Sequence, residues 1–168
     1  DFDDMLLLCY DLFRRRPDIL EQWQKRFRYI LIDEFQDVNR IQYEVVRMLA
    51  MPENNLFVVG DDDQSIYHFR GASPEIMLGF GEDYPETETI LLDVNYRSSR
   101  NIVNGALRVI SNNSRRYKKK LVTSGDKGAC IHVQEVKDAK EESKYLIDKI
   151  REAEKEGIPH SDMAVLYR

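Results

Sequence analysis

The sequence contains no apolar run that approaches the roughly 20 residues needed to cross a membrane, and it shows no signal-peptide pattern. We therefore expect a cytoplasmic protein with no membrane partner. Cysteine is also scarce, because Cys9 and Cys130 are the only two and lie far apart. Their surroundings favour buried free thiols in a reducing compartment over a disulfide. Internal repeats and low-complexity tracts are absent, so the 168 residues suit one domain or two small ones.

Positive charge is in deficit, with 25 lysines and arginines against 30 aspartates and glutamates and a net charge of -5. An acidic total argues against a surface coated by nucleic acid, but it leaves room for local basic patches. The strongest patch is residues 115–120, which are all arginine, lysine or tyrosine. Three possibilities remain open for it: contact with a DNA backbone, contact with an acidic neighbour, or a solvated loop.

Apolar residues recur with the spacing of helices and strands along the chain, and this pattern predicts an α/β fold. Helices are expected from Asp1 or Asp3 through Phe13, over residues 18–27, 40–50 and 139–156, and from residues 74 and 99 onward. Strands are expected over residues 29–32, 56–59, 89–92, 130–136 and 163–167. Because a helix separates the first two strands, a parallel pair joined by a right-handed crossover is the economical topology.

Polar side chains follow three short apolar runs, residues 29–32, 56–59 and 90–92, at the point where each run stops. In an open α/β sheet such runs are strands covered on both faces, and ligands lie just beyond their carboxyl ends. The polar residues at these ends are therefore the first candidates for a site.

Asp33 and Glu34 directly follow the first run. Neighbouring acids at a strand end point in different directions, so one can hold hydrated Mg²⁺ while the other polarises water that attacks a terminal phosphate. The alternative is that both merely cap the next helix.

Gln64 follows the second run, where an amide can contact both a γ-phosphate and the attacking water. Residues 61–63 are all aspartate, and we expect at least one of them to cap a helix or bind an arginine rather than all three to bind metal.

Aromatic rings alternate with other side chains in residues 65–70 and end at Arg70. On a surface loop, Tyr67 and Phe69 would stack bases of single-stranded DNA at about 1–3 kcal/mol each, without sequence preference. The alternative is that both rings belong to the core.

After the third run, Tyr96 can stack on an adenine. Arg97 can neutralise charge on a transferring γ-phosphoryl group, an effect worth about 10³–10⁵ in rate, and its alternative is a structural salt bridge.

Three segments in this order, residues 33–37, 60–72 and 95–98, resemble motifs II, III and IV of the UvrD/Rep/PcrA group of superfamily-one DNA helicases. The resemblance extends to residues 1–6 and 164–168, so it covers essentially the whole chain. Together these motifs are highly specific for the family.

The resemblance implies a partial RecA-like fold, in which a parallel sheet is flanked by helices. Residues 1–97 would form the end of the first RecA-like ATPase domain, and residues 98–168 the beginning of the second. ATP and Mg²⁺ are the implied cofactors. The implied roles are Asp33 as Mg²⁺ ligand, Glu34 as catalytic base beside the same metal, Gln64 as γ-phosphate sensor, Tyr96 as adenine platform, Arg97 as arginine finger, and Tyr67, Phe69 and Arg70 as contacts to single-stranded DNA.

The sequence also departs from the family pattern. Phe69 stands where the family usually has tryptophan, and this smaller ring keeps stacking while weakening it. The chain has no Gly-x-x-x-x-Gly-Lys-Ser/Thr phosphate loop, whose N–H groups and lysine cradle the β- and γ-phosphates. We therefore expect the central fragment of an ATP-driven 3′ to 5′ helicase or translocase of repair or replication, inactive alone. Its partners would be single-stranded and duplex DNA and the remaining helicase domains of the parent chain.

Other functions remain open. A helicase subunit of a helicase-nuclease of the AddA/RecB type would share the same motifs, and a downstream nuclease domain would distinguish it. A non-enzymatic RecA-like DNA-binding module would lack ATPase activity even with its flanking segments restored. A receiver-like phosphoacceptor is remote, because it would need a lysine after a later strand, where Tyr96 and Arg97 stand.

Overall fold

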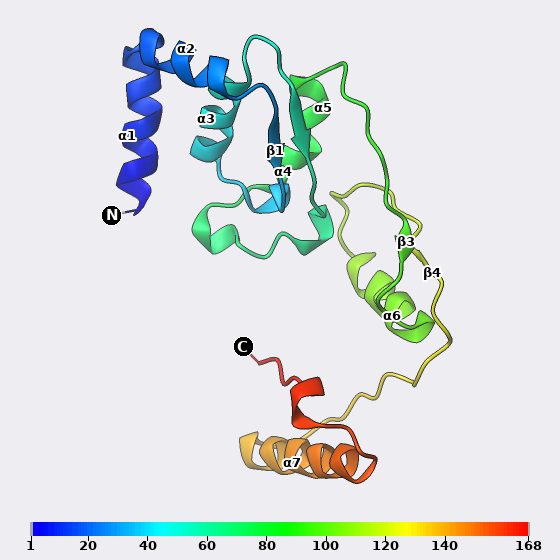
Figure 1. Cartoon of the computed structure of the whole chain (residues 1–168). Coiled ribbons are helices and arrows are strands. Elements are labelled where there is room, and N and C mark those ends of the chain that lie inside the picture. Colours follow the sequence, from blue (N-terminus) through cyan, green and yellow to red (C-terminus); the bar gives the residue numbers. More distant parts are fainter. Residues whose placement is uncertain (1, 168) are drawn as a thin grey trace. The chain divides into compact units, whose positions relative to one another are not determined.

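The computed structural model describes residues 2–167, apart from the side chains of Phe2 and Arg70. It divides into two compact units, Asp1–Gly128 and Ala129–Arg168. The helices are α1 (Phe2–Arg15), α2 (Pro17–Arg26), α3 (Arg40–Ala50), α4 (Pro74–Leu78), α5 (Phe80–Asp83), α6 (Arg100–Ile110) and α7 (Ala139–Lys155) (Figure 1). The strands are β1 (Ile30–Ile32), β2 (Leu56–Val58), β3 (Val94–Asn95) and β4 (Val122–Thr123). Short 3-10 helices are η1 (Phe35–Asp37), η2 (Asp62–Gln64), η3 (His68–Arg70) and η4 (His160–Asp162). The mixed α/β class is confirmed.

Local sequence signals explain where the helices of the first unit begin and end. Helix α1 ends at Arg15 and α2 begins at Pro17, because proline needs no N–H partner at the first helical position. Helix α3 follows Asn39, whose side-chain oxygen accepts a hydrogen bond from the N–H of Gln42 at 2.9 Å. The side-chain oxygen of Gln42 accepts one from the N–H of Asn39, also at 2.9 Å. This reciprocal pair satisfies two donors at the helix start, and the predicted bounds of α3 are confirmed.

Strands β1 and β2 form a parallel pair with α3 as the connecting helix (Figure 1). Leu31 lies opposite Phe57, and Ile32 lies opposite Val58. The predicted parallel strand-helix-strand unit is therefore confirmed. Parallel pairing places the ends of both strands at the same edge of the sheet, which is where the candidate site begins.

One face of this sheet carries the core, and the other face is exposed. The buried residues that form the core are Phe35, Tyr43, Ile76 and Phe80, with Ile32, Leu56 and Val58 packed against them. Leu31 and Phe57 point the other way and are 71% and 58% exposed. Side chains alternate between the faces of a strand, and within the described chain the helices that supply this core cover one face. The expectation that both faces are covered is wrong for these two strands.

The third apolar run does not join this sheet. Residues 89–92 are all described, and none of them belongs to a strand. Ile90 and Leu92 are 73% and 81% exposed. Pairing begins two residues later, where β3 runs parallel to β4 with Val94 opposite Val122. The predicted strand is wrong because a strand needs a neighbouring backbone to bond with, and apolar composition does not supply one.

The second unit consists of α7, η4 and extended segments. The side chain of Asp138 begins α7 by accepting hydrogen bonds from the N–H groups of Lys140 and Glu141, at 2.9 and 2.8 Å. Gly157 follows the helix with a φ of +84°, a left-handed conformation that glycine tolerates, so the predicted stop is confirmed.

Two further strand predictions are wrong. Residues 130–136 form no strand, and 163–167, also fully described, form none. Residues 130–136 alternate in sequence like a strand and 163–167 are an apolar run, but neither described segment forms a ladder. Cys130 is exposed and Cys9 is half-buried, so both thiols are free as expected but the expected burial of Cys130 is wrong.

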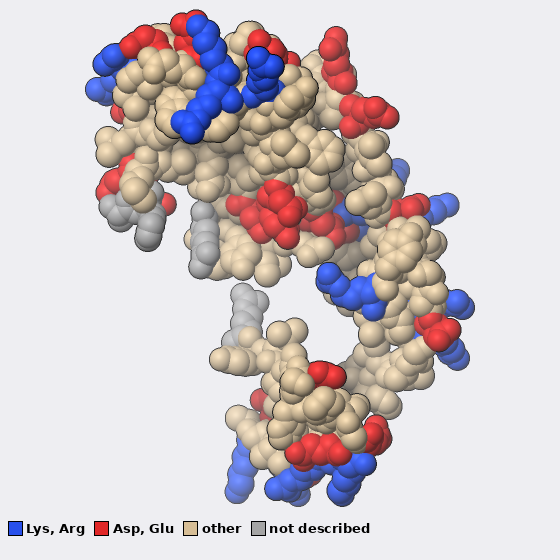
Figure 2. Space-filling view, viewed as in Figure 1, with Lys and Arg blue, Asp and Glu red and all other residues tan. Residues whose placement is uncertain are grey.

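Charged side chains of both signs are interspersed over the face seen in Figure 2, as the near balance of charges predicts. This face therefore carries no continuous basic coat. None of the helices within residues 2–167 is both long and apolar enough to cross a lipid bilayer.

Candidate active site

The segments that follow β1 and β2 are joined by backbone hydrogen bonds. The N–H of Val59 donates to the carbonyl of Ile32 at 2.8 Å, and the N–H of Phe35 donates to the carbonyl of Val59 at 2.9 Å. This extension of the ladder holds the residues that follow β1, Asp33 and Glu34, beside the loop that follows β2 and leads to Gln64.

Gln36 links the two strand ends through its side chain. It is 1% exposed, and its Oε1 accepts a hydrogen bond from the N–H of Asp61 at 2.9 Å. Its Nε2 donates to Glu34 Oε2 at 2.7 Å, and its backbone carbonyl accepts from Ser65 Oγ at 3.2 Å. An amide is a planar group that can donate to a carboxylate through its nitrogen while it accepts from an N–H through its oxygen. No role was predicted for Gln36 from the sequence, although a lone amide inside an acidic motif is the available signal.

Asp33 and Glu34 sit at a turn in which their side chains separate. Glu34 has a φ of 51°, in the left-handed region that residues other than glycine rarely adopt. Asp33 Oδ1 accepts a hydrogen bond from the N–H of Glu34 at 2.9 Å, while the Glu34 carboxylate binds Gln36 instead. Both side chains are exposed at the edge of the sheet. The geometry gives these neighbouring acids different partners and different directions.

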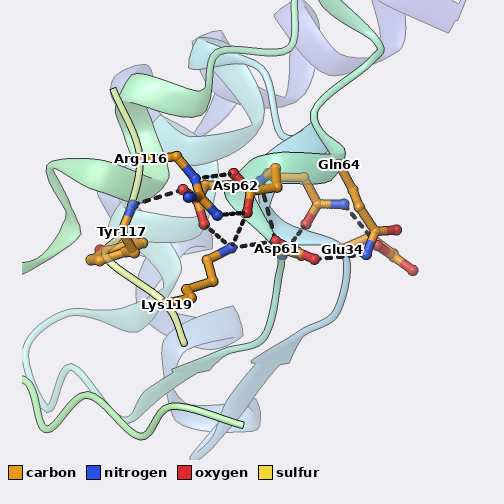
Figure 3. A network of polar contacts seen from close by, with 9 residues as sticks. Glu34, Asp61, Asp62, Gln64, Arg116, Tyr117 and Lys119 are labelled. Atoms are coloured by element: carbon orange, nitrogen blue, oxygen red, sulfur yellow. Dashed lines mark hydrogen bonds and ion pairs between the residues drawn. The ribbon is translucent and has the colours of Figure 1, made fainter. Parts of the chain in front are cut away.

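Gln64 ends η2 and is held by the carboxylate that begins it. Its Nε2 donates to Asp61 Oδ2 at 2.8 Å (Figure 3). Asp61 Oδ1 also accepts from the N–H of Asp63 at 3.1 Å, so Asp61 caps this turn. Asp61 therefore contacts Gln36 through its backbone and Gln64 through its side chain.

The acidic triplet, Asp61, Asp62 and Asp63, is neutralised by two cations from the basic patch at residues 115–120. Arg116 Nε donates to Asp63 Oδ1 at 2.7 Å, with a second bond from its Nη2. Lys119 Nζ contacts all three carboxylates, the one on Asp63 at 3.2 Å (Figure 3). The prediction that at least one of the three caps or binds an arginine is confirmed. Of the three possibilities for the basic patch, contact with acidic neighbours is the one that the structure shows for Arg116 and Lys119.

These contacts shift the ionisation of the cluster. The Arg116 hydrogen bond is the main reason that the pKa of Asp63 lies below its ordinary value. Burial alone would raise the pKa of Asp61, but the hydrogen bonds from Lys119 and Gln64 outweigh it and lower the pKa. Burial likewise opposes the charge on Lys119, yet the carboxylates around it raise its pKa above the ordinary value. These shifts favour the charged forms of Asp61, Asp63 and Lys119 at neutral pH.

We expect the Arg116–Asp63 pair to stabilise the fold in a pH-dependent way. Because the pKa of Asp63 is lower in the folded state, its contribution is complete above the ordinary value of 3.8 and is lost as the pH falls through the lowered pKa. Chemical denaturation of the wild type and of Asp63→Asn should show their widest difference in unfolding free energy near neutral pH. The difference should shrink below about pH 4. A difference that is constant with pH would contradict this ion-pair contribution.

Two groups of carboxylates are candidates for a metal ion. One oxygen from each residue of the acidic triplet lies within 4.8 Å of the others, but Lys119 and Arg116 already supply the positive charge there. Asp33 and Glu34 offer exposed carboxylate oxygens, the donors that Mg²⁺ prefers. Beside them Asp37 Oδ1 is buried and, within residues 2–167, accepts no hydrogen bond. The donor set after β1 therefore fits Mg²⁺ better than the triplet does.

The aromatic residues after Gln64 lie at the surface. Tyr67 is 38% and Phe69 77% exposed, with ring centroids 5.7 Å apart and ring planes inclined by 46°. The alternative that both rings belong to the core is therefore wrong. The side chain of Arg70, the third residue expected to contact DNA, lies outside the described residues.

Tyr96 and Arg97 follow β3, in the other two-stranded sheet. Asn95 Oδ1 accepts hydrogen bonds from the N–H groups of Arg97 and Ser98, at 3.0 and 2.8 Å, which fixes this turn. Tyr96 is 81% exposed, and Arg97 is exposed as well. In the part of the chain that the structure describes, no ion pair holds the Arg97 guanidinium, and no hydrogen bond joins Tyr96 or Arg97 to Glu34 or Gln64. The structure thus brings together the residues after β1 and β2, but not those after β3.

Comparison with known proteins identifies two family domains along the chain. Residues 1–85 match the UvrD/REP helicase N-terminal domain, and residues 90–168 match the UvrD-like helicase C-terminal domain. The whole chain is 50% identical to a Bacillus subtilis protein named putative ATP-dependent DNA helicase YjcD, over 22% of that protein. It is 46% identical to proteins named ATP-dependent DNA helicase PcrA from Staphylococcus aureus and Staphylococcus epidermidis, over 23% of each. The chain thus spans less than a quarter of these curated relatives. The motifs, the family matches and the identity along its full length show that the chain belongs to the UvrD/REP helicase family.

Proposed function

We propose that these residues are the central part of an ATP-dependent DNA helicase, in which ATP hydrolysis drives movement on single-stranded DNA. The observation that carries this proposal is the hydrogen-bonded array that joins Glu34, Gln36, Asp61 and Gln64 across two neighbouring strand ends. A carboxylate and an amide held at neighbouring strand ends of one sheet edge suit the attack of water on a terminal phosphate.

Each residue after β1 and β2 has a distinct role in this proposal. Asp33 and Glu34 would hold Mg²⁺, which when bound neutralises charge on the phosphates. Glu34 accepts the proton of the attacking water, because its carboxylate is exposed at the edge while Gln36 fixes its orientation. Gln64 contacts the γ-phosphate and its attacking water, and it leads directly into the segment that carries Tyr67 and Phe69. Hydrolysis at the strand ends is thereby linked to the loop that contacts DNA.

The exposed rings of Tyr67 and Phe69 support a role in DNA binding. Two rings 5.7 Å apart on a surface turn can stack on bases without reading sequence. We propose that Arg70 adds a contact to the backbone of single-stranded DNA. The family resemblance favours 3′ to 5′ movement, work in repair or replication on single-stranded and duplex DNA, and a cytoplasmic location.

We further propose that Tyr96 stacks on the adenine and that Arg97 is the arginine finger. Both would act once the parent chain brings the end of β3 to the nucleotide. We propose that the first RecA-like domain ends at residue 97 and that the second begins at residue 98. The boundary between the two family matches lies a little earlier, between residues 85 and 90. Strand β3, which precedes the proposed division, pairs with β4, which follows it.

A chimera tests the proposal. In this chimera the 168 residues replace the matching segment of the Staphylococcus aureus PcrA protein, to which they are 46% identical. We expect the chimera to hydrolyse ATP faster when single-stranded DNA is present. The isolated chain should show no DNA-stimulated turnover, because it has no phosphate loop to hold the β- and γ-phosphates. Unmodified PcrA sets the reference rate. A folded chimera without DNA-stimulated ATPase, or an isolated chain with it, would overturn the proposal.

A further inference from the structure

Lys119 is an almost buried cation that the proposed catalytic chemistry does not use. Its side chain is 8% exposed, and that of its partner Asp62 is 2% exposed. Burying a lysine is unfavourable unless opposite charges surround it, and here the three carboxylates of the acidic triplet do so. Three carboxylates held this close would in turn repel one another without the cations. The lysine and the triplet therefore depend on each other.

Asp61 connects this ion cluster to both candidate catalytic residues. One of its carboxylate oxygens contacts Lys119, and the other accepts the hydrogen bond from Gln64 at 2.8 Å. Its backbone N–H donates to Gln36, which holds Glu34 at 2.7 Å. An unbroken set of hydrogen bonds and ion pairs thus runs from Lys119 to Gln64 and to Glu34 (Figure 3).

The cations come from a distant part of the chain. Lys119 is 58 residues from Asp61, and Arg116 is 53 residues from Asp63. They lie in the segment between α6 and β4, within the region that matches the C-terminal domain, while the acidic triplet lies within the N-terminal match. The same segment is anchored by the N–H of Tyr117, which donates to Asp62 Oδ2 at 2.8 Å. Any movement of this segment changes the charge that faces Asp61.

We propose that Lys119, supported by Arg116, is a positioning residue: it holds the Asp61 carboxylate so that the Gln64 amide keeps one orientation beside Glu34. This inference rests on the proposed function, since it assigns Lys119 a part in the same hydrolysis. It adds that the region of the C-terminal match controls the geometry of the site in the N-terminal match. Without Lys119, the carboxylates of Asp62 and Asp63 repel the carboxylate of Asp61. The Asp61 side chain then moves, and Gln64 loses its fixed acceptor.

The test uses Lys119→Met in the chimera, with Lys127→Met, an exposed lysine in the same unit, as the matched control. We expect kcat for DNA-stimulated ATP hydrolysis to fall about 10- to 100-fold, the size of effect that a misplaced catalytic group produces. KM for ATP should change less than about threefold, because this contact orients a group rather than binding nucleotide. Lys119→Arg should restore most of kcat, and Lys127→Met should keep it.

A second comparison separates positioning from simple loss of structure. If Lys119 acts through Gln64, then Lys119→Met should lower kcat little further in a Gln64→Ala background. Asp61→Asn provides an independent variant, because it leaves two carboxylates facing two cations where the wild type has three facing two, so no cation loses all its acidic partners. It should lower kcat in the same way in a chimera that is still folded at the assay temperature, as circular dichroism would show. Full kcat in Lys119→Met or Asp61→Asn, or additive losses with Gln64→Ala, would overturn the inference. An unmodified chimera without ATPase would instead overturn the proposed function.

Discussion

Replacing Glu34 with glutamine in the chimera is expected to lower ATP turnover by about 10²–10⁴-fold, the contribution of a positioned general base. The substitution removes the proton acceptor but keeps the shape of the side chain. Glutamine still offers an oxygen to Gln36 Nε2, the donor that Glu34 Oε2 accepts from at 2.7 Å, so the array across the strand ends persists. Nucleotide binding should therefore remain, and single-turnover hydrolysis together with binding of a fluorescent ATP analogue would measure both.

The matched control for this substitution is Glu86→Gln, which removes the same charge from an exposed residue between α5 and β3. Its turnover should stay within about twofold of the unmodified chimera, as surface substitutions away from a site usually have small effects. If Glu34→Gln kept turnover within tenfold, Glu34 would not be the base. If it lost nucleotide binding as well, its role would be structural.

The parts of the fold that follow local rules were predictable from the sequence. The break between α1 and α2 at Pro17, the bounds of α3 and the stop of α7 before Gly157 each depend on one or two neighbouring residues, although α2 begins and ends one residue earlier than the expected 18–27. The parallel pairing of β1 with β2 was also predictable, because a helix between two short apolar runs leaves few other topologies.

Strands that need a distant partner were not predictable in the same way. Residues 89–92, 130–136 and 163–167 have the composition of strands but form none in this structure, in which all three are described. A strand is stable only when a neighbouring backbone satisfies its N–H and C=O groups. Such a neighbour is a property of the tertiary arrangement, which a run of apolar residues does not specify.

The candidate site shows the same division. The sequence placed Asp33, Glu34 and Gln64 at neighbouring strand ends, because strand ends in a parallel pair share one edge. It did not identify Gln36 as their link, because the hydrogen-bond partners of an amide side chain depend on which groups the fold brings next to it. Nor did it choose among the partners of the basic patch, because Lys119 and Asp61 are 58 residues apart and composition alone does not pair them.

Replacing Phe35 with alanine is expected to lower the free energy of unfolding by about 3–5 kcal/mol, the usual loss for a buried phenylalanine. Its ring is 0% exposed and lies edge-on to Tyr43 and Phe80, with centroids 5.8 and 5.5 Å away, so truncation leaves a cavity between α3 and α5. Urea unfolding followed through the fluorescence of the only tryptophan, Trp23, would measure the change. Phe69→Ala removes the same ring where it is 77% exposed and should cost less than about 1 kcal/mol. Equal losses in the two variants would mean that Phe35 does not centre the core that supports the residues after β1.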